Sequence, residues 1–394
     1  MAITLNQLMD FMVAQGASDL HCAVGRKPVI RKSGHLKDVN APELTAADTI
    51  RLVKEIAPEK NMKELQENGS TDWGHAFGDK ARFRCAAFKQ KNQVGMVMRQ
   101  IPNRLLTFEQ IGLPENTKRL LDRPRGLILV TGPTGSGKTT TLATMIDWIN
   151  TNLDHHIITV EDPIEYYHQH KKSIVTQREL GNDVPTFSEG LRRALRQDPD
   201  VILVGEMRDL ETIGAAITAA ETGHLVFGTL HTTGATRTVD RIIDAFPTNQ
   251  QEQVRAQLAV SMIACISQAI MPKVGGGLIA AFEIMVSTSA VENLIREAKT
   301  YQLNSVIQTG KKEGMVLLDD YLWELWNAQK ITRLEMFRKC SNNKEMREKY
   351  ESFRRGKGKL WDDALVAEEE ARITGGSAPP AAAAAAAASQ RRVK

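Results

Sequence analysis

The sequence has few of the features that mark disulfide-rich, zinc-binding, secreted or membrane-spanning proteins. Its 394 residues include four cysteines, which lie far apart and form no C-x-x-C pair: Cys22, Cys85, Cys265 and Cys340. A zinc site built on paired cysteines is therefore not expected, and sparse cysteines suit a reducing cytoplasm. No apolar run reaches the roughly 20 residues of a membrane-spanning helix, and the N-terminus lacks the basic segment and apolar core of a secretory signal. We expect a cytoplasmic protein without a membrane span.

An excess of charge of one sign is also missing. The 51 basic side chains face 47 acidic ones, the net charge is +4, and aromatic residues make up 5% of the chain. A protein that moves along nucleic acid needs a basic, salt-sensitive channel and aromatic side chains on which bases stack. The composition supports neither, so nucleic acid is not an expected partner.

The first hundred residues predict a small α+β domain. Residues 3–15 have apolar side chains at helical spacing, and residues 45–67 are also helical in pattern. The strand-like runs between and after them are PVIRKSGHLKDV, ARFRCAAF and QVGMVMRQI. We place this domain at residues 1–100, followed by a polar linker over residues 101–118.

From residue 119 the pattern changes to alternating apolar runs and helical segments. The runs are LILVTG, HIITVED, VILVGE and HLVFGTLH. Continuously apolar strands between helices are typical of a parallel sheet covered on both faces, which predicts an α/β domain over residues 119–340. Its part from residue 250 looks mostly helical, with one strand-like run, LIAAFEIM. Residues 341–394 are charge-rich and then alanine-rich, and we expect a flexible tail there.

The strongest motif lies at the end of the first of these apolar runs. Gly132, Gly137, Lys138 and Thr139 match the pattern G-x-x-x-x-G-K-[ST] of a phosphate-binding loop between a strand and a helix. Backbone N–H groups and the helix N-terminus would hold the phosphates of ATP, Lys138 would reach the β- and γ-phosphates, and the Thr139 hydroxyl would bind Mg²⁺. The predicted nucleotide-binding residues are Gly132, Pro133, Thr134, Gly135, Ser136, Gly137, Lys138, Thr139 and Thr140. The alternative is a glycine-rich turn without a ligand.

Acidic residues follow two of the other apolar runs. In VILVGEMRD the strand ends at Glu206, where a carboxylate can orient or deprotonate an attacking water. In ITVEDPIEY, the acids Glu161, Asp162 and Glu165 would repel one another unless a cation or solvent lay between them. They predict a Mg²⁺ and water network, with a surface turn at Pro163 as the alternative.

Histidine and arginine supply further candidates that the residues alone leave open. His231 follows another strand in GTLHTT, although a single histidine more often has a structural role. Arg82 and Arg84 alternate on one strand of the small domain and therefore share a face, where they could meet a phosphate. A solvated strand face explains these arginines equally well, and Arg99 is a weaker candidate.

The order of these motifs carries a family resemblance. The phosphate loop, the acidic cluster, LRQDPDVILVGEMRD and GTLHTT follow one another as in the secretion-type ATPases of type II secretion and type IV pili. The similarity runs from about residue 3 to residue 340 and includes the ASDLH segment. Within that superfamily the chain is most similar to the PilT family of pilus retraction ATPases. It has neither the long N-terminal extension nor the four-cysteine insert that are usual in assembly ATPases.

The resemblance implies a fold and roles for the candidate residues. It implies a RecA-like P-loop ATPase domain and a PAS-like N-terminal domain in a homo-hexamer that hydrolyses ATP with Mg²⁺. It makes Glu206 the catalytic Walker B acid and His231 a nucleotide-sensing residue. It assigns the acidic box to Glu161, Asp162 and Glu165, and it brings Arg82 and Arg84 to the nucleotide.

The resemblance also implies a biological role. The hexamer would power pilus retraction and twitching motility by driving pilin disassembly through an inner-membrane platform protein, to which the pilus machinery would attach it peripherally. A paralogous pilus ATPase is a further expected partner. A pilus assembly or secretion ATPase and a DNA-translocating ring ATPase remain as alternatives. One motif departs from the family: Ala290–Leu294 reads AVENL where retraction motors often have A-I-R-N-L, so Glu292 reverses a charge.

Overall fold

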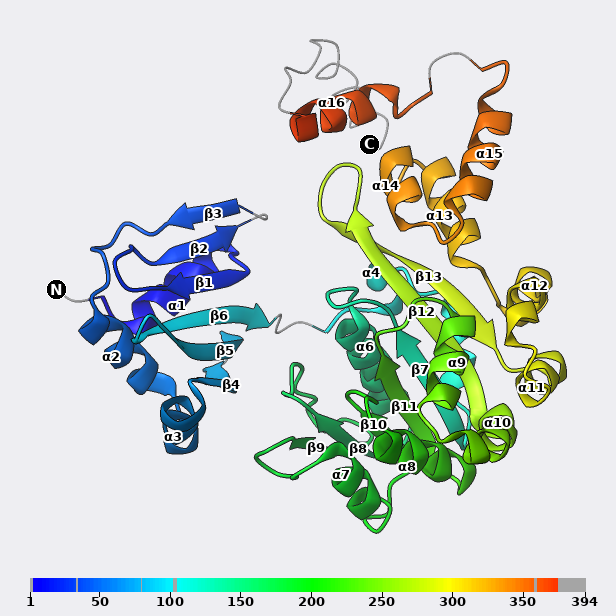
Figure 1. Ribbon diagram of the computed structural model, residues 1–394, viewed down its shortest axis with the longest axis horizontal. Helices are drawn as coiled ribbons and strands as arrows, with labels where there is room; N and C mark the ends of the chain where they lie inside the picture. Colours follow the sequence, from blue (N-terminus) through cyan, green and yellow to red (C-terminus); the bar gives the residue numbers. More distant parts are fainter. Residues whose placement is uncertain (1–2, 33–34, 79, 102–104, 358–359, 375–394) are drawn as a thin grey trace. The chain divides into compact units, whose positions relative to one another are not determined.

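The computed structural model describes residues 3–32, 35–78, 80–101, 105–357 and 360–374 (Figure 1). They divide into two compact units. The first consists of Met1–Leu105, Glu161–Gln169 and Gln177–Asp183, and the second consists of Leu106–Val160, His170–Thr176 and Val184–Lys394. The predicted linker residues 102–104 and the tail residues 375–394 lie outside the described residues. Among the described residues, no helix is both long and apolar enough to cross a bilayer.

The first unit contains a six-stranded antiparallel sheet of order β3-β2-β1-β6-β5-β4. Its core comes from the apolar side of the sheet and the helices that pack against it. The first helix is specified locally, since Thr4 and Gln7 form a capping box and Gly16 ends the helix in the left-handed conformation. The strands are β1 Asp19–Cys22, β2 Val29–Lys32, β3 His35–Asp38, β4 Ser70–Phe77, β5 Ala81–Gln90 and β6 Gln93–Ile101, and the helices are α1 Leu5–Gln15, α2 Ala46–Ile56 and α3 Glu59–Asn68.

The second sheet has seven strands in the order β13-β12-β7-β11-β10-β8-β9. Strands β12, β7, β11, β10 and β8 run parallel, and β13 is antiparallel to β12. The prediction of an α/β fold with a parallel sheet is therefore confirmed. The strands are β7 Gly126–Thr131, β8 His156–Glu161, β9 Ile174–Glu179, β10 Val201–Val204, β11 Leu225–Leu230, β12 Met262–Pro272 and β13 Leu278–Val286.

The helices accompanying the second sheet lie before its first strand, between its strands and after its last strand. Those before β12 are α4 Phe108–Ile111, α5 Lys118–Leu121, α6 Lys138–Asn152, α7 Phe187–Ala194, α8 Leu210–Glu221, α9 Ala235–Asp244 and α10 Thr248–Ser261. Those after β13 are α11 Ser289–Arg296, α12 Leu303–Thr309, α13 Leu318–Asn327, α14 Arg333–Lys339, α15 Asn343–Arg354 and α16 Asp363–Thr374.

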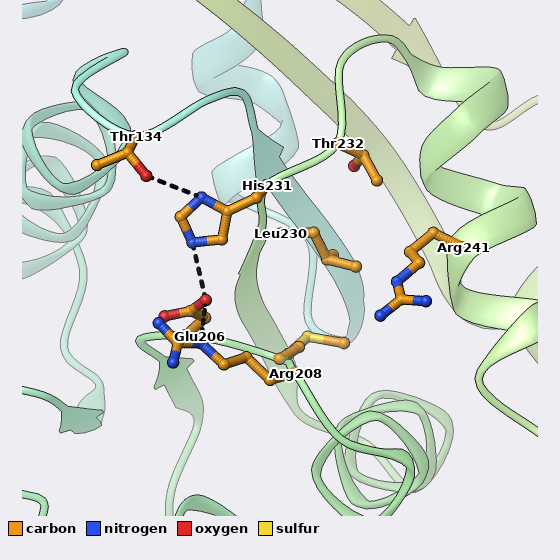
Figure 2. A pocket seen from close by; sticks show the side chains of 8 residues that line it. Thr134, Glu206, Arg208, Leu230, His231, Thr232 and Arg241 are labelled. Carbon is orange, nitrogen blue, oxygen red and sulfur yellow. Dashed lines mark hydrogen bonds and ion pairs between the residues drawn. The ribbon is translucent and has the colours of Figure 1, made fainter.

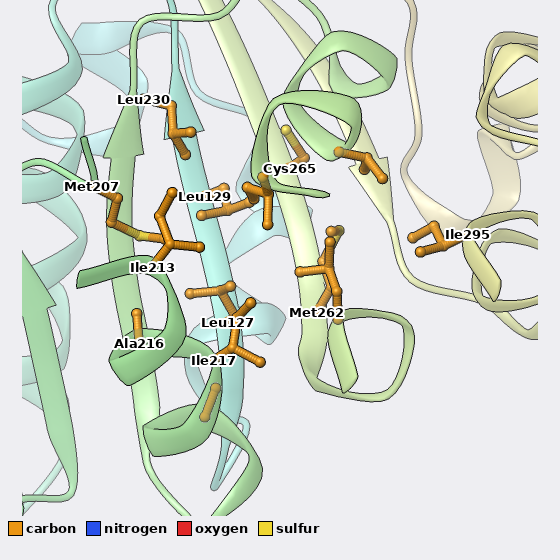
Figure 3. Close-up of a cluster of buried hydrophobic side chains, with 14 of the residues drawn as sticks. Leu127, Leu129, Met207, Ile213, Ala216, Ile217, Leu230, Met262, Cys265 and Ile295 are labelled. Atoms are coloured by element: carbon orange, nitrogen blue, oxygen red, sulfur yellow. The ribbon is translucent and has the colours of Figure 1, made fainter. Parts of the chain in front are cut away.

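Strand β7 demonstrates that this sheet is buried on both faces. Leu127 and Leu129 belong to one hydrophobic cluster, together with Ile213 and Ile217 of α8 (Figure 3). Ile128 and Val130, which alternate with them, belong to a second cluster on the other face. Because side chains cover both faces, polar groups carried by these strands can reach solvent only beyond the strand ends.

The structure corrects two expected boundaries, those of the linker and of the tail, and the expectation of a mostly helical stretch after residue 250. The linker predicted over residues 101–118 includes α4, whose buried Phe108 packs into the core of the second unit. Strand β12 lies in a stretch expected to be mostly helical. Its run MIACISQAIM is mostly apolar, with only Ser267 and Gln268 as polar residues, and periodicity alone cannot distinguish a buried strand from a buried helix in such a run.

The prediction that a flexible tail begins at residue 341 is wrong for the described residues up to 374. Helix α15 buries Met346 and Tyr350 against α13 and α14. These two residues form an apolar stripe on a helix whose other residues are mostly charged or polar, so the stripe was not evident in the sequence. Asp362 is fully buried before α16, where its carboxylate accepts hydrogen bonds from Trp326 Nε1 at 3.0 Å and from the backbone N–H of Arg333 at 2.7 Å. These helices extend the second unit, and we call α13–α16 the C-terminal helical module.

Candidate active site

The glycine loop connects β7 to α6, as its motif predicts. Gly132, Gly135 and Gly137 all have positive φ, at 144°, 78° and 87°. A Cβ atom on Gly132 would lie 2.4 Å from the backbone oxygen of Gln268, so a side chain has no room there. Gln268 of β12 also donates from Nε2 to the oxygen of Ser136 at 2.5 Å. The neighbouring strand thus fixes the loop against the sheet.

The loop has the polar groups that a phosphate site requires. Helix α6 begins at Lys138 with no side-chain cap on its N-terminus, so its first N–H groups remain available to an anion. The Ser136 Oγ atom is buried and has no hydrogen-bond partner among the described residues. Lys138 folds back over the loop and donates to the oxygens of Gly132 and Pro133 at 2.8 and 3.2 Å. A triphosphate fits this donor set, and Thr139 at the start of α6 stays the predicted Mg²⁺ ligand.

A carboxylate and a histidine from adjacent strands meet beside the loop. Glu206 follows β10, and His231 follows β11, the strand between β10 and β7. The His231 Nε2 atom lies 2.8 Å from Glu206 Oε1, and its Nδ1 atom lies 3.4 Å from the Thr134 hydroxyl of the glycine loop. Figure 2 shows the imidazole ring between these two groups. Three motifs that are separate in the sequence thus meet at one edge of the sheet.

Arg208 completes the surroundings of Glu206. Its Nε atom contacts Glu206 Oε1, the same oxygen that faces His231. Partial burial raises the pKa of Glu206, but the hydrogen bond and positive charge of Arg208, with a smaller effect of His231, outweigh burial and hold the pKa below its ordinary value. Glu206 is therefore ionised at neutral pH and can accept a proton.

These groups line a cavity of about 610 Å³ in the second unit. Its lining residues are Thr134, Glu206, Met207, Arg208, Leu230, His231, Thr232 and Arg241. Arg208 and Arg241 were not among the residues expected from the sequence. Arg208 lies two residues after Glu206, whereas Arg241 comes from the second turn of α9, and no local pattern marks it.

The acidic cluster belongs to the first unit. Glu161 at the end of β8 is nearly buried, and its Oε1 accepts a hydrogen bond from Gln177 Nε2 at 3.1 Å. Asp162 is exposed and Glu165 is half-buried. These acids lie in the segment Glu161–Gln169, which belongs to the first unit although Glu161 also ends β8 of the seven-stranded sheet. Their catalytic role stays a prediction.

The arginines of β5 and β6 have different surroundings within the first unit. Arg82 is 6% exposed; its Nη2 atom lies 3.6 Å from Glu179 Oε2, and its guanidinium lies 3.8 Å from the ring centre of Tyr167. Its Nε and Nη1 atoms are buried without a hydrogen-bond partner among the described residues. Arg84 is exposed. Arg99 donates to Asp19 at 2.8 Å, which gives it a structural role.

A glycine loop before a helix, with an ionised carboxylate at the end of a neighbouring parallel strand, places the chain among P-loop nucleoside triphosphatases. Comparison with known proteins narrows this class. Residues 1–301 match the family model described as "Type II/IV secretion system protein". The chain is 52% identical over 315 residues to the "Type IV pilus retractation ATPase PilT" of Pseudomonas aeruginosa, which covers 80% of this chain and 92% of that protein.

Two further similarities agree with this match. A "Twitching motility protein" of Neisseria gonorrhoeae is 47% identical over 320 residues, covering 81% of this chain and 86% of that protein. A solved structure of the "Pilus Retraction Motor PilT and Bound ADP" is 45% identical with a TM-score of 0.82, covering 88% of this chain and 99% of that one. The chain therefore belongs to the type II/IV secretion ATPase family, within its PilT branch of retraction ATPases. It is an ATPase.

Proposed function

We propose that this chain is the motor subunit of a homo-hexamer that hydrolyses ATP to drive pilus retraction. The main support for ATP hydrolysis is the contact between Glu206 and His231 beside the glycine loop. The identity to a retraction ATPase and to a twitching motility protein supports the biological part. In the cell, the hexamer works in the cytoplasm, attached to the inner membrane through a platform protein, and a paralogous ATPase shares its task.

In the proposed mechanism, the side chains around the loop bind and orient the nucleotide. Lys138 exchanges its contacts with the loop carbonyls for the β- and γ-phosphates. Thr139 would hold a Mg²⁺ ion, which would supply positive charge against the charge that develops on the phosphates. Glu206 accepts the proton of the attacking water. His231, between Thr134 of the loop and Glu206, senses whether the phosphate is present.

Further roles are proposed for residues of the first unit. We assign the PAS-like fold to the N-terminal domain and a phosphate contact to Arg82 and Arg84. The two unpartnered nitrogens of Arg82 support that assignment, because a buried guanidinium is stabilised when an anion accepts its hydrogen bonds. Glu161, Asp162 and Glu165 support the metal and its water shell in this proposal.

The test is pilus dynamics in cells, imaged with labelled pili. Cells that lack the chain should carry excess pili that extend and do not withdraw, and the wild-type chain should restore withdrawal, whereas Glu206→Gln should not. Bald cells would instead identify an assembly ATPase. Unchanged pili in a strain without a second pilus ATPase would contradict a pilus function and favour secretion or DNA translocation.

A further inference from the structure

Glu283 of β13 is a buried carboxylate that none of the roles above uses. It is 5% exposed, and its two oxygens accept hydrogen bonds from two different helices. Oε1 accepts from the backbone N–H of Ala235 at 2.7 Å, and Oε2 accepts from the backbone N–H of Leu318 at 3.4 Å. Ala235 is the first residue of α9 and Leu318 is the first residue of α13. One side chain thus joins the N-termini of two helices that are far apart in sequence.

The first of these helices leads directly back to the cavity. Only Thr232, Thr233 and Gly234 separate His231 from Ala235. The N–H of Gly234 donates to Ser267 Oγ at 2.9 Å, and Ser267 lies opposite Glu283 in the β12–β13 pairing. Two adjacent side chains of the sheet therefore hold two successive N–H groups of the turn that carries His231. A shift of either anchor would move the imidazole relative to Glu206.

The second helix begins the C-terminal helical module. The residue before it, Leu317, provides no side-chain cap, so Glu283 supplies an acceptor that the local sequence lacks. Helix α13 contributes Leu322 and Trp326 to the cluster that holds α14 and α15. The first turn of the module and the turn that carries His231 are consequently hydrogen-bonded to the same carboxylate.

Capping the N-terminus of a helix does not require a carboxylate from a distant strand. A helix N-terminus is ordinarily capped by a serine, threonine, aspartate or asparagine directly before it. Helix α9 has Gly234 there instead, at φ 85°, and a Cβ atom on Gly234 would lie 3.3 Å from Glu283 Oε1. The glycine permits the close approach of a distant carboxylate, although burial is costly for a charge and raises the pKa of Glu283.

We propose that Glu283 is a positioning residue for ATP hydrolysis, which holds the His231 turn and the first turn of α13 in a fixed relation. Movement of the C-terminal helical module then changes the contact between His231 and Glu206, and nucleotide-dependent movement of His231 acts on the module. This inference rests on the roles proposed above for Glu206 and His231.

The test is Glu283→Gln in the full chain. The amide keeps the volume and one acceptor, but its NH₂ group faces one of the two N–H donors and breaks that contact. We expect kcat to fall by about 10-fold because the imidazole is displaced, while KM for ATP changes by less than about 2-fold. Glu335→Gln is the matched control, because Glu335 is equally buried at 5% exposure but pairs with Arg338 on α14. It should leave kcat unchanged.

A double-mutant cycle distinguishes positioning from a structural role. If Glu283 acts through the histidine, Glu283→Gln should lower kcat by less than about 2-fold in a His231→Ala background. The same 10-fold loss in both backgrounds, or a lowered melting temperature with kcat unchanged, would overturn the inference. Glu283→Asp is the second variant in case the amide does not fold; it is one methylene too short to reach both N–H groups, and the same loss of kcat is expected.

Glu206→Gln, assayed in the same series, separates this inference from the proposed function. A Glu206→Gln variant near the wild-type rate would overturn the catalytic assignment on which both depend. An inactive Glu206→Gln variant beside a fully active Glu283→Gln variant would overturn the role of Glu283 alone.

Discussion

The two sheets of the molecule differ in where their charged side chains lie. In the antiparallel sheet, charges lie within the strands, as with Asp19 on β1 and Arg84 on β5. In the other sheet, β7 and β10 contain no charged residue, and Glu206 and His231 come after the strand ends. Strands β7 and β10, which are buried on both faces, exclude charge, although Glu161 ends β8 and Glu283 lies on β13 of the same sheet. A sheet with one open face can carry charge within its strands. A charged residue at the end of a buried parallel strand therefore indicates a functional role. A charged residue within the antiparallel sheet does not, so its role must be tested directly.

The largest expected effect is the loss of ATP turnover when the glycine loop at the edge of the parallel sheet is altered. Lys138→Ala removes the cation that would hold the β- and γ-phosphates, so turnover should fall by at least about 10³-fold. Phosphate release by the purified variant measures it. Lys172→Ala is the control, because the ammonium group of Lys172 donates to the backbone oxygen of Asn152 at the other end of α6. Turnover near the wild-type rate in Lys138→Ala would remove the loop from the site.

The next effect tests whether the antiparallel sheet also takes part in catalysis. Arg84→Ala should lower kcat by about 10²-fold, because an exposed guanidinium assigned to a phosphate would be lost. Arg99→Ala is the matched control, since Arg99 is committed to Asp19. It should leave kcat unchanged. Equal kcat values for the two variants would mean that Arg84 lies on a solvated strand face and has no catalytic role.

A structural effect is expected at Asp19, the buried partner of Arg99. Burial raises the pKa of Asp19. Hydrogen bonds from Arg99 and Ser18, together with the positive charge of Arg99, outweigh burial and lower the pKa below its ordinary 3.8. The ionised form therefore stabilises the fold above pH 3.8, and this contribution disappears as the pH falls through the lowered pKa. Asp19→Ala should reduce the local free energy of unfolding by about 2 kcal/mol at pH 7.

Hydrogen exchange of the β1 and β6 amides measures this loss against the wild type. The difference between the two proteins should shrink as the pH falls below 3.8, because the wild type then loses the same charge. A difference that grows toward acid pH would contradict the assigned ion pair.

The smallest effect concerns the pH dependence of the catalytic carboxylate. Because Arg208 lowers the pKa of Glu206, Arg208→Ala should raise it, and the acid side of the kcat/KM profile should move to higher pH. Arg241→Ala is the control, since Arg241 lines the same cavity without a contact to Glu206 among those drawn in Figure 2. A profile that stays in place or moves to lower pH would show that Arg208 does not set the ionisation of Glu206.

Residues that follow a strand in a recognisable motif could be predicted from the sequence. The glycine loop, Glu206 and His231 each follow an apolar run, and the ends of parallel strands bring such residues to one edge of a sheet. The class of fold followed from the same runs. Strand β12 could not be predicted, because its mostly apolar run, broken only by the adjacent Ser267 and Gln268, does not alternate with a period of two.

The other misses depend on contacts between distant segments. Arg241 reaches the cavity from a helix, and Glu283 serves two helices that begin 48 residues before it and 35 residues after it. In the C-terminal helical module, Met346 and Tyr350 form an apolar stripe only where α13 and α14 are present to cover it. From its composition alone, this segment therefore resembled a flexible tail.

The central claim is that ATP hydrolysis depends on the carboxylate at the end of β10. The direct measurement is single-turnover hydrolysis and ATP binding by Glu206→Gln, with Glu211→Gln on the exposed first turn of α8 as the control. The amide cannot accept the proton of the attacking water, so hydrolysis should fall by about 10²-fold or more while ATP still binds. A hydrolysis rate within a few-fold of the wild type, with Glu211→Gln unchanged, would contradict the claim.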